Sequence, residues 1–174
     1  MRIIITGSPG TGKSSIAKAL SARLGMALID LKQVAADKKL VGKNHEVDIG
    51  RLARAVRPLV RKDDFIVEGH LACEFRIPAD FIFVLRTNPG VLARRLARRH
   101  YQAKKLGDNL MGEMLDYCSV RAKSEYGKTP LELDTSGRSV GESVREIENA
   151  IKRKKKKLDT VDYSDELKDW LKLR

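Results

Sequence analysis

Residues 7–14 have the sequence GSPGTGKS and stand between a short apolar run, residues 3–5, and a segment in which Ile16, Leu20 and Leu24 recur at helical spacing. This order predicts a strand, a glycine-rich loop and a helix. Glycines let such a loop curl until several backbone N–H groups point at one anion, and the dipole of the following helix adds positive potential there. The stretch is therefore a phosphate-binding loop (P-loop) and predicts nucleoside triphosphate binding.

Two side chains of the P-loop have specific expected tasks. Lys13 is expected to reach the β- and γ-phosphates of ATP, and the hydroxyl of Ser14 is expected to ligate Mg²⁺. The alternative is a chance glycine-rich turn. All the fixed glycine and lysine positions are filled in a strand–loop–helix context, which favours the P-loop.

The bulk properties place the chain in a broad class. A length of 174 residues suits one domain, and the longest apolar runs, such as residues 81–85, have the length of a strand rather than of a membrane span. The apolar run at residues 3–5 is too short for a signal peptide, so we expect a cytoplasmic protein, or a nuclear one in a eukaryote. Cys73 and Cys118 lack CxxC spacing and are expected to be buried thiols.

The charge is strongly positive and unevenly distributed. Of the net charge of +12, residues 1–151 carry +8, and residues 152–157 are six consecutive basic side chains. A polyphosphate ligand or an RNA contact would suit such a surface. Thermal adaptation is the alternative for the body of the protein, and a solvated charge run is the alternative for residues 152–157.

Strands and helices alternate along the chain, which predicts an α/β fold with a five-stranded parallel sheet flanked by helices. A stripe formed by Ile49, Leu52, Val56 and Leu59 predicts a helix that kinks or ends at Pro58. The predicted strands are residues 2–6, 27–30, 65–68, 81–85 and 131–134, and the predicted helices are residues 13–24, two pieces within 31–62, 91–99, a segment after 108–109, 140–152 and a helical tail after 158.

Two side chains follow the third predicted strand. Glu68 ends the strand at the edge where the P-loop lies, so its carboxylate can order Mg²⁺ or a metal-bound water. His70 points to the same side if the extended conformation continues, and it is a candidate for a base or a water-orienting group. The alternatives are a capping or ion-paired carboxylate for Glu68 and an ordinary loop histidine for His70.

Arginines gather after the fourth predicted strand. Arg86 ends that strand, and a basic helix follows over residues 91–99. Such a cluster is typical of a lid that closes over phosphates, and we select Arg99 as the catalytic candidate, whereas Arg94 and Arg95 are interpreted as a solvated helix face. We expect Asp108 and Asn109 to cap the next helix, whose core stripe is Leu110, Met111, Met114, Leu115 and Cys118.

The loop after the last strand, residues 135–138, lies on the same edge as the P-loop. Backbone groups there can hold an adenine ring, and Arg138 can cover it. Ser139 and Glu142 form a capping box that predicts the start of the helix over residues 140–152. The expected anchors of the tail are Val161, Leu167, Trp170 and Leu171.

The combined pattern resembles the nucleoside monophosphate kinases, and among them the adenylate kinase isoenzyme 6 family. Three blocks carry the resemblance, which extends over about residues 1–152: residues 7–15, the Glu-Gly-His of residues 68–70, and the basic segment of residues 98–109. Glu68 stands where this family usually has Asp, and His100 stands where a glycine is common. Residues 69–72 replace the Gly-Phe-Pro-Arg motif with which ordinary adenylate kinases hold AMP.

The resemblance implies one kinase-like domain over residues 1–152, with a monophosphate-binding arm at about 30–53 and a lid at about 98–108. Residues 153–174 lie outside the resemblance, and their own pattern predicts a basic helical appendage. The resemblance also implies Mg²⁺-dependent transfer of phosphate from ATP to AMP or another monophosphate, together with ATP hydrolysis. The implied cellular role is late maturation of the small ribosomal subunit, through a platform ribosomal protein. The basic surface of the chain is the candidate for an rRNA contact. The implied ATP-binding residues are Gly10, Gly12, Lys13, Ser14, Ser15, Arg99 and Arg138.

The sequence leaves two other functions open. One is an ATP-switched ribosome-assembly factor with little AMP kinase activity. The other is a kinase for a different small metabolite.

Overall fold

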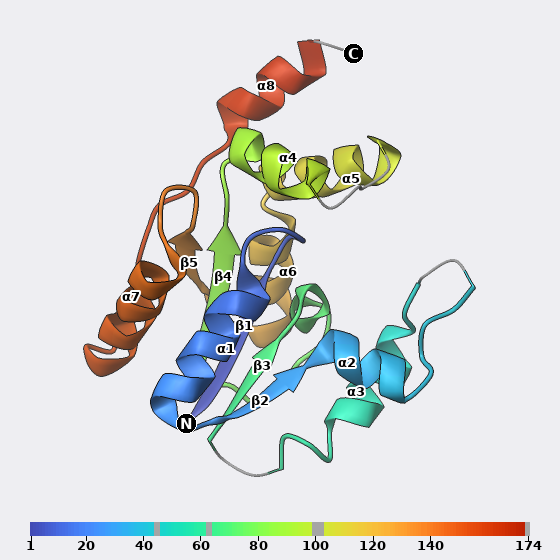
Figure 1. Ribbon diagram of the computed structural model, residues 1–174, viewed down its shortest axis with the longest axis vertical. Helices are drawn as coiled ribbons and strands as arrows, with labels where there is room; N and C mark the ends of the chain where they lie inside the picture. The colour runs from blue at the N-terminus through green and yellow to red at the C-terminus, as the bar shows by residue number, and fades with distance from the viewer. Residues whose placement is uncertain (44–45, 62–63, 99–102, 173–174) are drawn as a thin grey trace.

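The computed structural model describes residues 1–43, 46–61, 64–98 and 103–172. One five-stranded sheet forms the centre of the molecule, in the order β2-β3-β1-β4-β5, and every neighbouring pair is parallel. This arrangement confirms the predicted sheet (Figure 1). The strands are β1 (Arg2–Gly7), β2 (Ala27–Asp30), β3 (Phe65–Glu68), β4 (Phe81–Arg86) and β5 (Leu131–Asp134).

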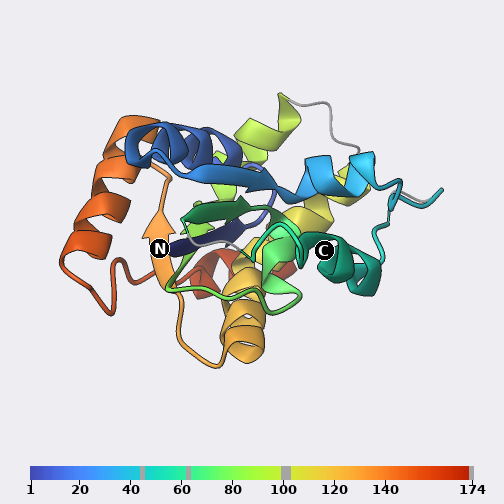
Figure 2. The ribbon, with the colours of Figure 1, turned by 90° about the horizontal axis from the view of Figure 1, so that it is seen from below.

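Helices cover both faces of the sheet, and Figure 2 shows the layers from below. Ile3 and Ile5 of β1 pack toward the face covered by α1 and α7, and Ile4 packs toward the opposite face. This alternation is what a strand buried on both sides requires. The helices are α1 (Lys13–Leu24), α2 (Leu31–Asp37), α3 (Ile49–Val56), the 3₁₀ turn η1 (His70–Cys73), α4 (Pro89–Ala97), α5 (Ala103–Met114), α6 (Tyr117–Tyr126), α7 (Val140–Lys152) and α8 (Ser164–Lys172). None of these helices is both long and apolar enough to cross a membrane.

Local signals correctly predicted several helix ends. Gly25 ends α1 in the left-handed conformation, and Ser139 with Glu142 forms the expected capping box at the start of α7. Helix α3 ends at Val56, just before Pro58, as predicted. The apolar stripe was wrong at Leu59, which is 47% exposed because it lies in the turn after the helix.

The predicted start of the helix after the basic segment was wrong. Asp108 and Asn109 do not cap a helix; they lie inside α5, which begins at Ala103. The expected single stripe also divides between two helices, because Asp116 adopts a left-handed conformation (φ 53°) between α5 and α6. Leu115 is consequently 54% exposed.

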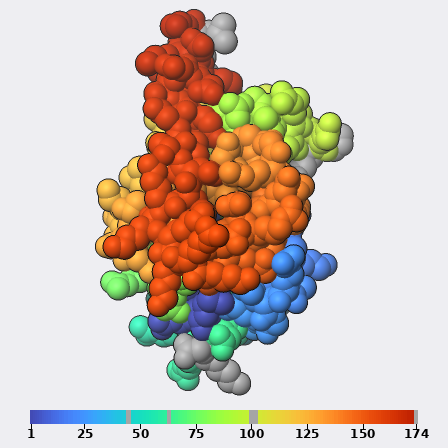
Figure 3. All heavy atoms as spheres, turned by 90° about the vertical axis from the view of Figure 1, so that its left-hand side faces the viewer, coloured from blue at the N-terminus to red at the C-terminus, as the bar shows by residue number. Residues whose placement is uncertain are grey.

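The C-terminal segment packs along the molecule and leads to α8, which lies beside α4 at one end (Figure 3). Tyr163 is buried with Leu92 and Leu96 of α4, and Val161, Leu167 and Trp170 pack against the same cluster, as expected of anchors. The fourth expected anchor, Leu171, was wrong and is 59% exposed.

Candidate functional site

The P-loop joins β1 to α1 at the carboxyl edge of the sheet and lies below α4 and α5 (Figure 1). Gly10 and Gly12 have φ values of 93° and 94°, which favour glycine. A Cβ atom on Gly10 would stand only 2.8 Å from Cδ1 of Leu92 in α4. The loop is therefore closely packed as well as tightly curled.

Ser8 is the centre of hydrogen bonding inside the P-loop. Its carbonyl oxygen accepts from the backbone N of Thr11 (3.3 Å), from Oγ1 of Thr11 (2.9 Å) and from Nζ of Lys13 (2.9 Å). Lys13 is buried, and this burial lowers the pKa of its ammonium group, although nearby Glu68 and Glu113 act in the opposite direction. The loop thus holds the predicted phosphate-binding lysine in place.

Glu68 and Ser14, the two predicted metal residues, lie side by side. Glu68 ends β3 next to Ile5 of β1 and Asp30 of β2, and it is 4% exposed. Burial raises the pKa of Glu68, whereas a hydrogen bond with the Ser14 side chain lowers it. A hydroxyl and a carboxylate are hard oxygen ligands of the kind that suits Mg²⁺.

A Mg²⁺ ion here would depend on ligands from outside the protein. Among residues 1–43, 46–61, 64–98 and 103–172, no group of three or more His, Cys, Asp or Glu side chains could hold a metal. Mg²⁺ in phosphotransferases commonly uses one or two protein ligands together with water and substrate phosphates. Ser14 and Glu68 fit that arrangement.

His70 is close to the P-loop, but not by the expected route. The strand ends at Glu68, and the chain turns at Gly69 into η1, so the predicted extended continuation was wrong. Although the residue as a whole is exposed, desolvation of the ring and the positive charges of Lys13 and Lys105 lower the pKa of His70 to about 4. The imidazole is therefore neutral at pH 7.

The interpretation of Arg95 as a solvated residue was wrong. Its guanidinium donates to the carbonyl oxygen of Gly10 (3.5 Å) in the P-loop and to that of Thr135 (2.8 Å) after β5. Arg94 is exposed, as predicted. The signal that could have identified Arg95 is its spacing, because it stands three residues after Leu92, whose side chain is buried in α4.

A buried ionic cluster behind the P-loop was not predicted from the sequence. Arg86 at the end of β4 is 1% exposed and pairs with Glu113 (2.9 Å), Glu132 (2.6 Å) and Asp116 (2.5 Å). Its guanidinium also lies 5.2 Å from the centre of the Tyr163 ring. Burial alone would lower the pKa of Arg86, but the carboxylates outweigh it and raise the pKa.

The two remaining candidate arginines differ in what the structure describes. Arg138 donates to the carbonyl oxygen of Asp134 (2.7 Å) and pairs with the carboxylate of Asp159 in the C-terminal segment. Its role at an adenine ring stays a prediction. Arg99 lies outside the described residues, and so does His100.

Cys73 and Cys118 are free and buried, as expected. The two thiols share a hydrogen bond, which together with burial raises the pKa of Cys73. The Cys73 thiol also donates to the carbonyl oxygen of His70 (3.1 Å). These contacts join η1 to α6 beside the P-loop.

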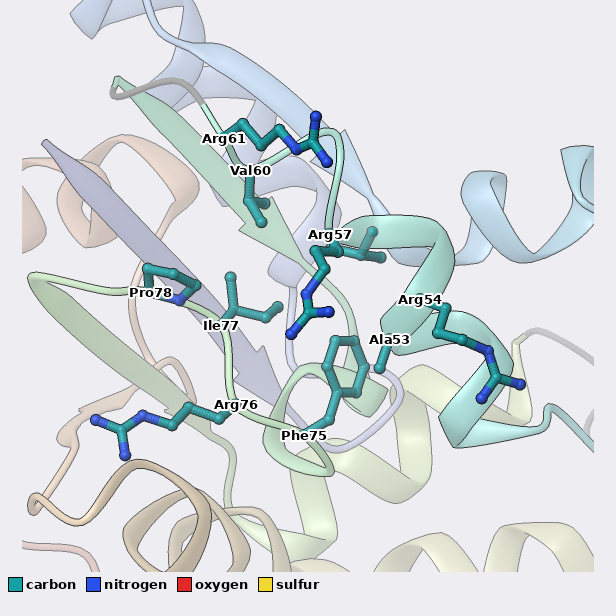
Figure 4. A pocket seen from close by; sticks show the side chains of 10 residues that line it. Ala53, Arg54, Arg57, Val60, Arg61, Phe75, Arg76, Ile77 and Pro78 are labelled. Carbon is teal, nitrogen blue, oxygen red and sulfur yellow. The ribbon is translucent and has the colours of Figure 1, made fainter.

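A hollow of about 750 Å³ lies apart from the P-loop, between the end of α3 and the segment that leads into β4. In the close view of Figure 4, Phe75 and Ile77 line it, Arg57 extends over it, and Arg54 and Arg76 point outward in different directions. No P-loop residue lines this hollow. It is therefore not the predicted nucleotide site.

The comparison with protein families gives a clear result. A family model described as an AAA domain matches residues 3–116, which include the P-loop, Glu68, His70 and Arg86. This chain belongs to the AAA-domain family.

Curated relatives of this AAA-domain protein are similar over almost its whole length. A Thermococcus onnurineus protein named "Putative adenylate kinase" is 37% identical over 170 residues, covering 95% of this chain and 93% of that protein. A protein of the same name from Methanocaldococcus jannaschii is 37% identical over 180 residues, covering 99% of this chain and 98% of its own length. The similarity therefore includes the segment after Lys152, which the expected resemblance left out.

Solved structures agree with the AAA-domain chain in fold. Shikimate kinase from Acinetobacter baumannii, in complex with shikimate, matches with a TM-score of 0.66 and 18% identity, covering 88% of this chain and 94% of that one. A gluconokinase from Sinorhizobium meliloti matches with a TM-score of 0.63 and 18% identity, covering 87% and 91%. Both support the sheet order and its flanking helices.

Proposed function

We propose that the protein is a Mg²⁺-dependent kinase that transfers the γ-phosphoryl group of ATP to a nucleoside monophosphate, with AMP as the first acceptor to test. The observation that carries this proposal is the grouping of Lys13, Ser14 and Glu68 at one edge of the sheet. The names of the two archaeal relatives support the same reaction.

The P-loop residues bind and orient the triphosphate. The backbone at Gly10 and Gly12 faces the phosphates, Lys13 moves from the Ser8 carbonyl oxygen to the β- and γ-phosphates, and Ser14 with Ser15 completes the ATP site. Ser14 would hold Mg²⁺ directly and Glu68 would hold it through water; the ion, when bound, would supply charge neutralisation for the phosphates.

His70 positions the acceptor rather than removing its proton. A pKa of about 4 makes the imidazole a weak base at pH 7, but its neutral ring can accept a hydrogen bond from a hydroxyl group or from water. Arg99 stabilises the charge of the transferring group, and Arg138 contacts the adenine ring, as their positions in the sequence predict.

The finer role that we propose follows the resemblance to the adenylate kinase isoenzyme 6 family: ATP hydrolysis beside kinase activity, and a part in small-subunit maturation with a platform ribosomal protein. The basic side chains of residues 152–157, exposed apart from Lys155, are available for an rRNA contact. The alternative is an assembly factor in which ATP hydrolysis alone changes the affinity for such a ribosomal partner.

The test counts products. Purified protein is incubated with Mg·ATP, with and without AMP, and ADP and inorganic phosphate are measured over time. Two ADP for each ATP consumed, with little phosphate, supports the kinase. ATP loss matched by phosphate and indifferent to AMP contradicts it and supports the assembly factor, and a panel of other small acceptors distinguishes a metabolite kinase.

A further inference from the structure

A single carboxylate connects the P-loop to helix α5. Glu113 is 2% exposed, and its Oε2 accepts a hydrogen bond from Oγ of Ser8 at 2.5 Å. Its Oε1 accepts from Nε of Arg86 (2.9 Å) and from the backbone N of Thr87 (3.0 Å). One oxygen of Glu113 is thus fixed by the end of β4, while the other receives the P-loop serine.

The buried pair with Arg86 fixes the position of this carboxylate. A buried charge is tolerated when an opposite charge and further hydrogen bonds compensate it, and Glu113 has both. Arg86 also donates to the backbone oxygen of Glu113 (2.9 Å) and is itself held by Asp116 and Glu132. Glu113 therefore presents a rigid acceptor to the P-loop.

Ser8 transmits that rigidity to the phosphate-binding groups. Its side chain donates to Glu113, while its carbonyl oxygen receives the two donors of Thr11 and the ammonium group of Lys13. A loop that is already ordered loses less conformational entropy when it binds a ligand. Fixing Ser8 should therefore strengthen triphosphate binding.

We propose that Glu113 is a positioning residue for the P-loop, acting through Ser8 to hold the loop in its triphosphate-binding shape before nucleotide arrives. This inference rests on the proposed function only in requiring that the P-loop binds Mg·ATP. It is independent of the acceptor. A purely structural cluster around Arg86 is the competing explanation, so the test must separate the two.

The chain offers a matched control. Ser119 donates its hydroxyl to Glu132 at 2.5 Å, and Glu132 belongs to the same Arg86 cluster. Ser8→Ala and Ser119→Ala each remove one hydroxyl from a carboxylate of this cluster, but Ser8 alone belongs to the P-loop. Ser8→Cys adds a variant of similar size whose thiol is a weaker donor.

The first measurement is Mg·ATP binding by calorimetry, well below the melting temperature of each variant. We expect Ser8→Ala to raise the Kd by roughly ten- to a hundredfold, since a hydrogen bond to a charged group contributes on that scale. Ser8→Cys should fall between wild type and Ser8→Ala, and Ser119→Ala should stay within about twofold of wild type.

The second measurement follows the loop without nucleotide. Amides of residues 10–13 should exchange hydrogen faster in Ser8→Ala than in the wild type or in Ser119→Ala. The inference is overturned if Ser8→Ala binds Mg·ATP like the wild type, or if Ser119→Ala loses as much affinity. Wild-type protein that binds Mg·ATP but phosphorylates no monophosphate would overturn the proposed function alone.

Discussion

The P-loop and the arm formed by α2 and α3 flank the same edge of the sheet, but different interactions hold them. Ser8, Thr11 and Lys13 of the P-loop are buried, and the contacts of the loop come from β4, α4 and α5. In the described part of the arm, side-chain hydrogen bonds stay local, as where Asp30 and Asp48 cap their own helices.

This difference shows which half of the proposed site, the nucleotide half or the acceptor half, is ordered before its ligand binds. The nucleotide half has its shape fixed by contacts that are distant in sequence, so it is ordered before ligand binds. The arm is held by a few apolar side chains, such as Leu52 and Val56, and presents an exposed outer surface. If the arm holds the acceptor, as the proposed function requires, a change in the arm can affect the acceptor without disturbing ATP.

The largest expected effect is in the P-loop. Lys13→Ala should reduce turnover of Mg·ATP by about 10²- to 10³-fold or more, because in the proposed reaction it removes a positive charge from the transferring phosphoryl group. Single-turnover assays check this. Lys18→Ala, an exposed lysine on the same helix, is the matched control and should keep wild-type turnover. Equal losses of turnover in Lys13→Ala and Lys18→Ala would mean that the P-loop lysine has no special role in the reaction.

The next effect concerns the cluster that supports the P-loop. Arg86→Met should lower the free energy of unfolding by about 3–5 kcal/mol, because it leaves Glu113 buried without its counter-charge. Arg2→Met removes a half-exposed pair with Asp80 and should lower it by at most about 1 kcal/mol. Urea denaturation measures both. Similar losses in the free energy of unfolding for Arg86→Met and Arg2→Met would mean that the buried cluster does not stabilise the P-loop half of the site.

In the arm, substitutions should change the free energy of unfolding mainly through the loss of apolar packing. Leu52→Ala removes a fully buried side chain of α3 and should lower the free energy of unfolding by about 2–5 kcal/mol. Leu59→Ala, at an exposed position after the helix, should change it by no more than about 0.5 kcal/mol. If Leu52→Ala also weakens Mg·ATP binding, measured by calorimetry, the two halves are not independent.

The smallest effect is a pH dependence at His70. The pKa in the folded state is about 4, below the ordinary value of 6.5, so the unfolded chain binds the proton more readily between these values. This contribution to stability is complete above about pH 6.5 and is lost as the pH falls through about 4. His70→Asn should remove that part of the dependence, while Lys13, Lys105 and Glu74, which surround the ring, stay in place. Melting temperatures from pH 4 to 7 for both proteins test it; identical slopes would contradict a neutral His70.

Sequence patterns identified the parts of the site that have a local signal in the chain. They missed parts that depend on contacts between distant segments or on an unexpected turn. The P-loop lies within eight consecutive residues, and Glu68 was placed by its position at a strand end. Arg95 was misread because its helix also carries exposed arginines, and a basic residue gives no sign of which carbonyl oxygens it meets. The path of the chain after Glu68 was missed because Gly69 permits a turn that a strand pattern does not predict.

The sequence by itself determined the alternation of strands and helices, the parallel sheet and the ends of helices such as α1 and α7, because strand length, glycine caps and capping boxes act within a few residues. Only the tertiary structure decided that Glu113 meets Ser8, which is 105 residues away, and that Tyr163 covers Arg86. Such contacts depend on how whole elements pack. The burial of Glu113 is a property of the assembled fold, and no spacing in the chain encodes it.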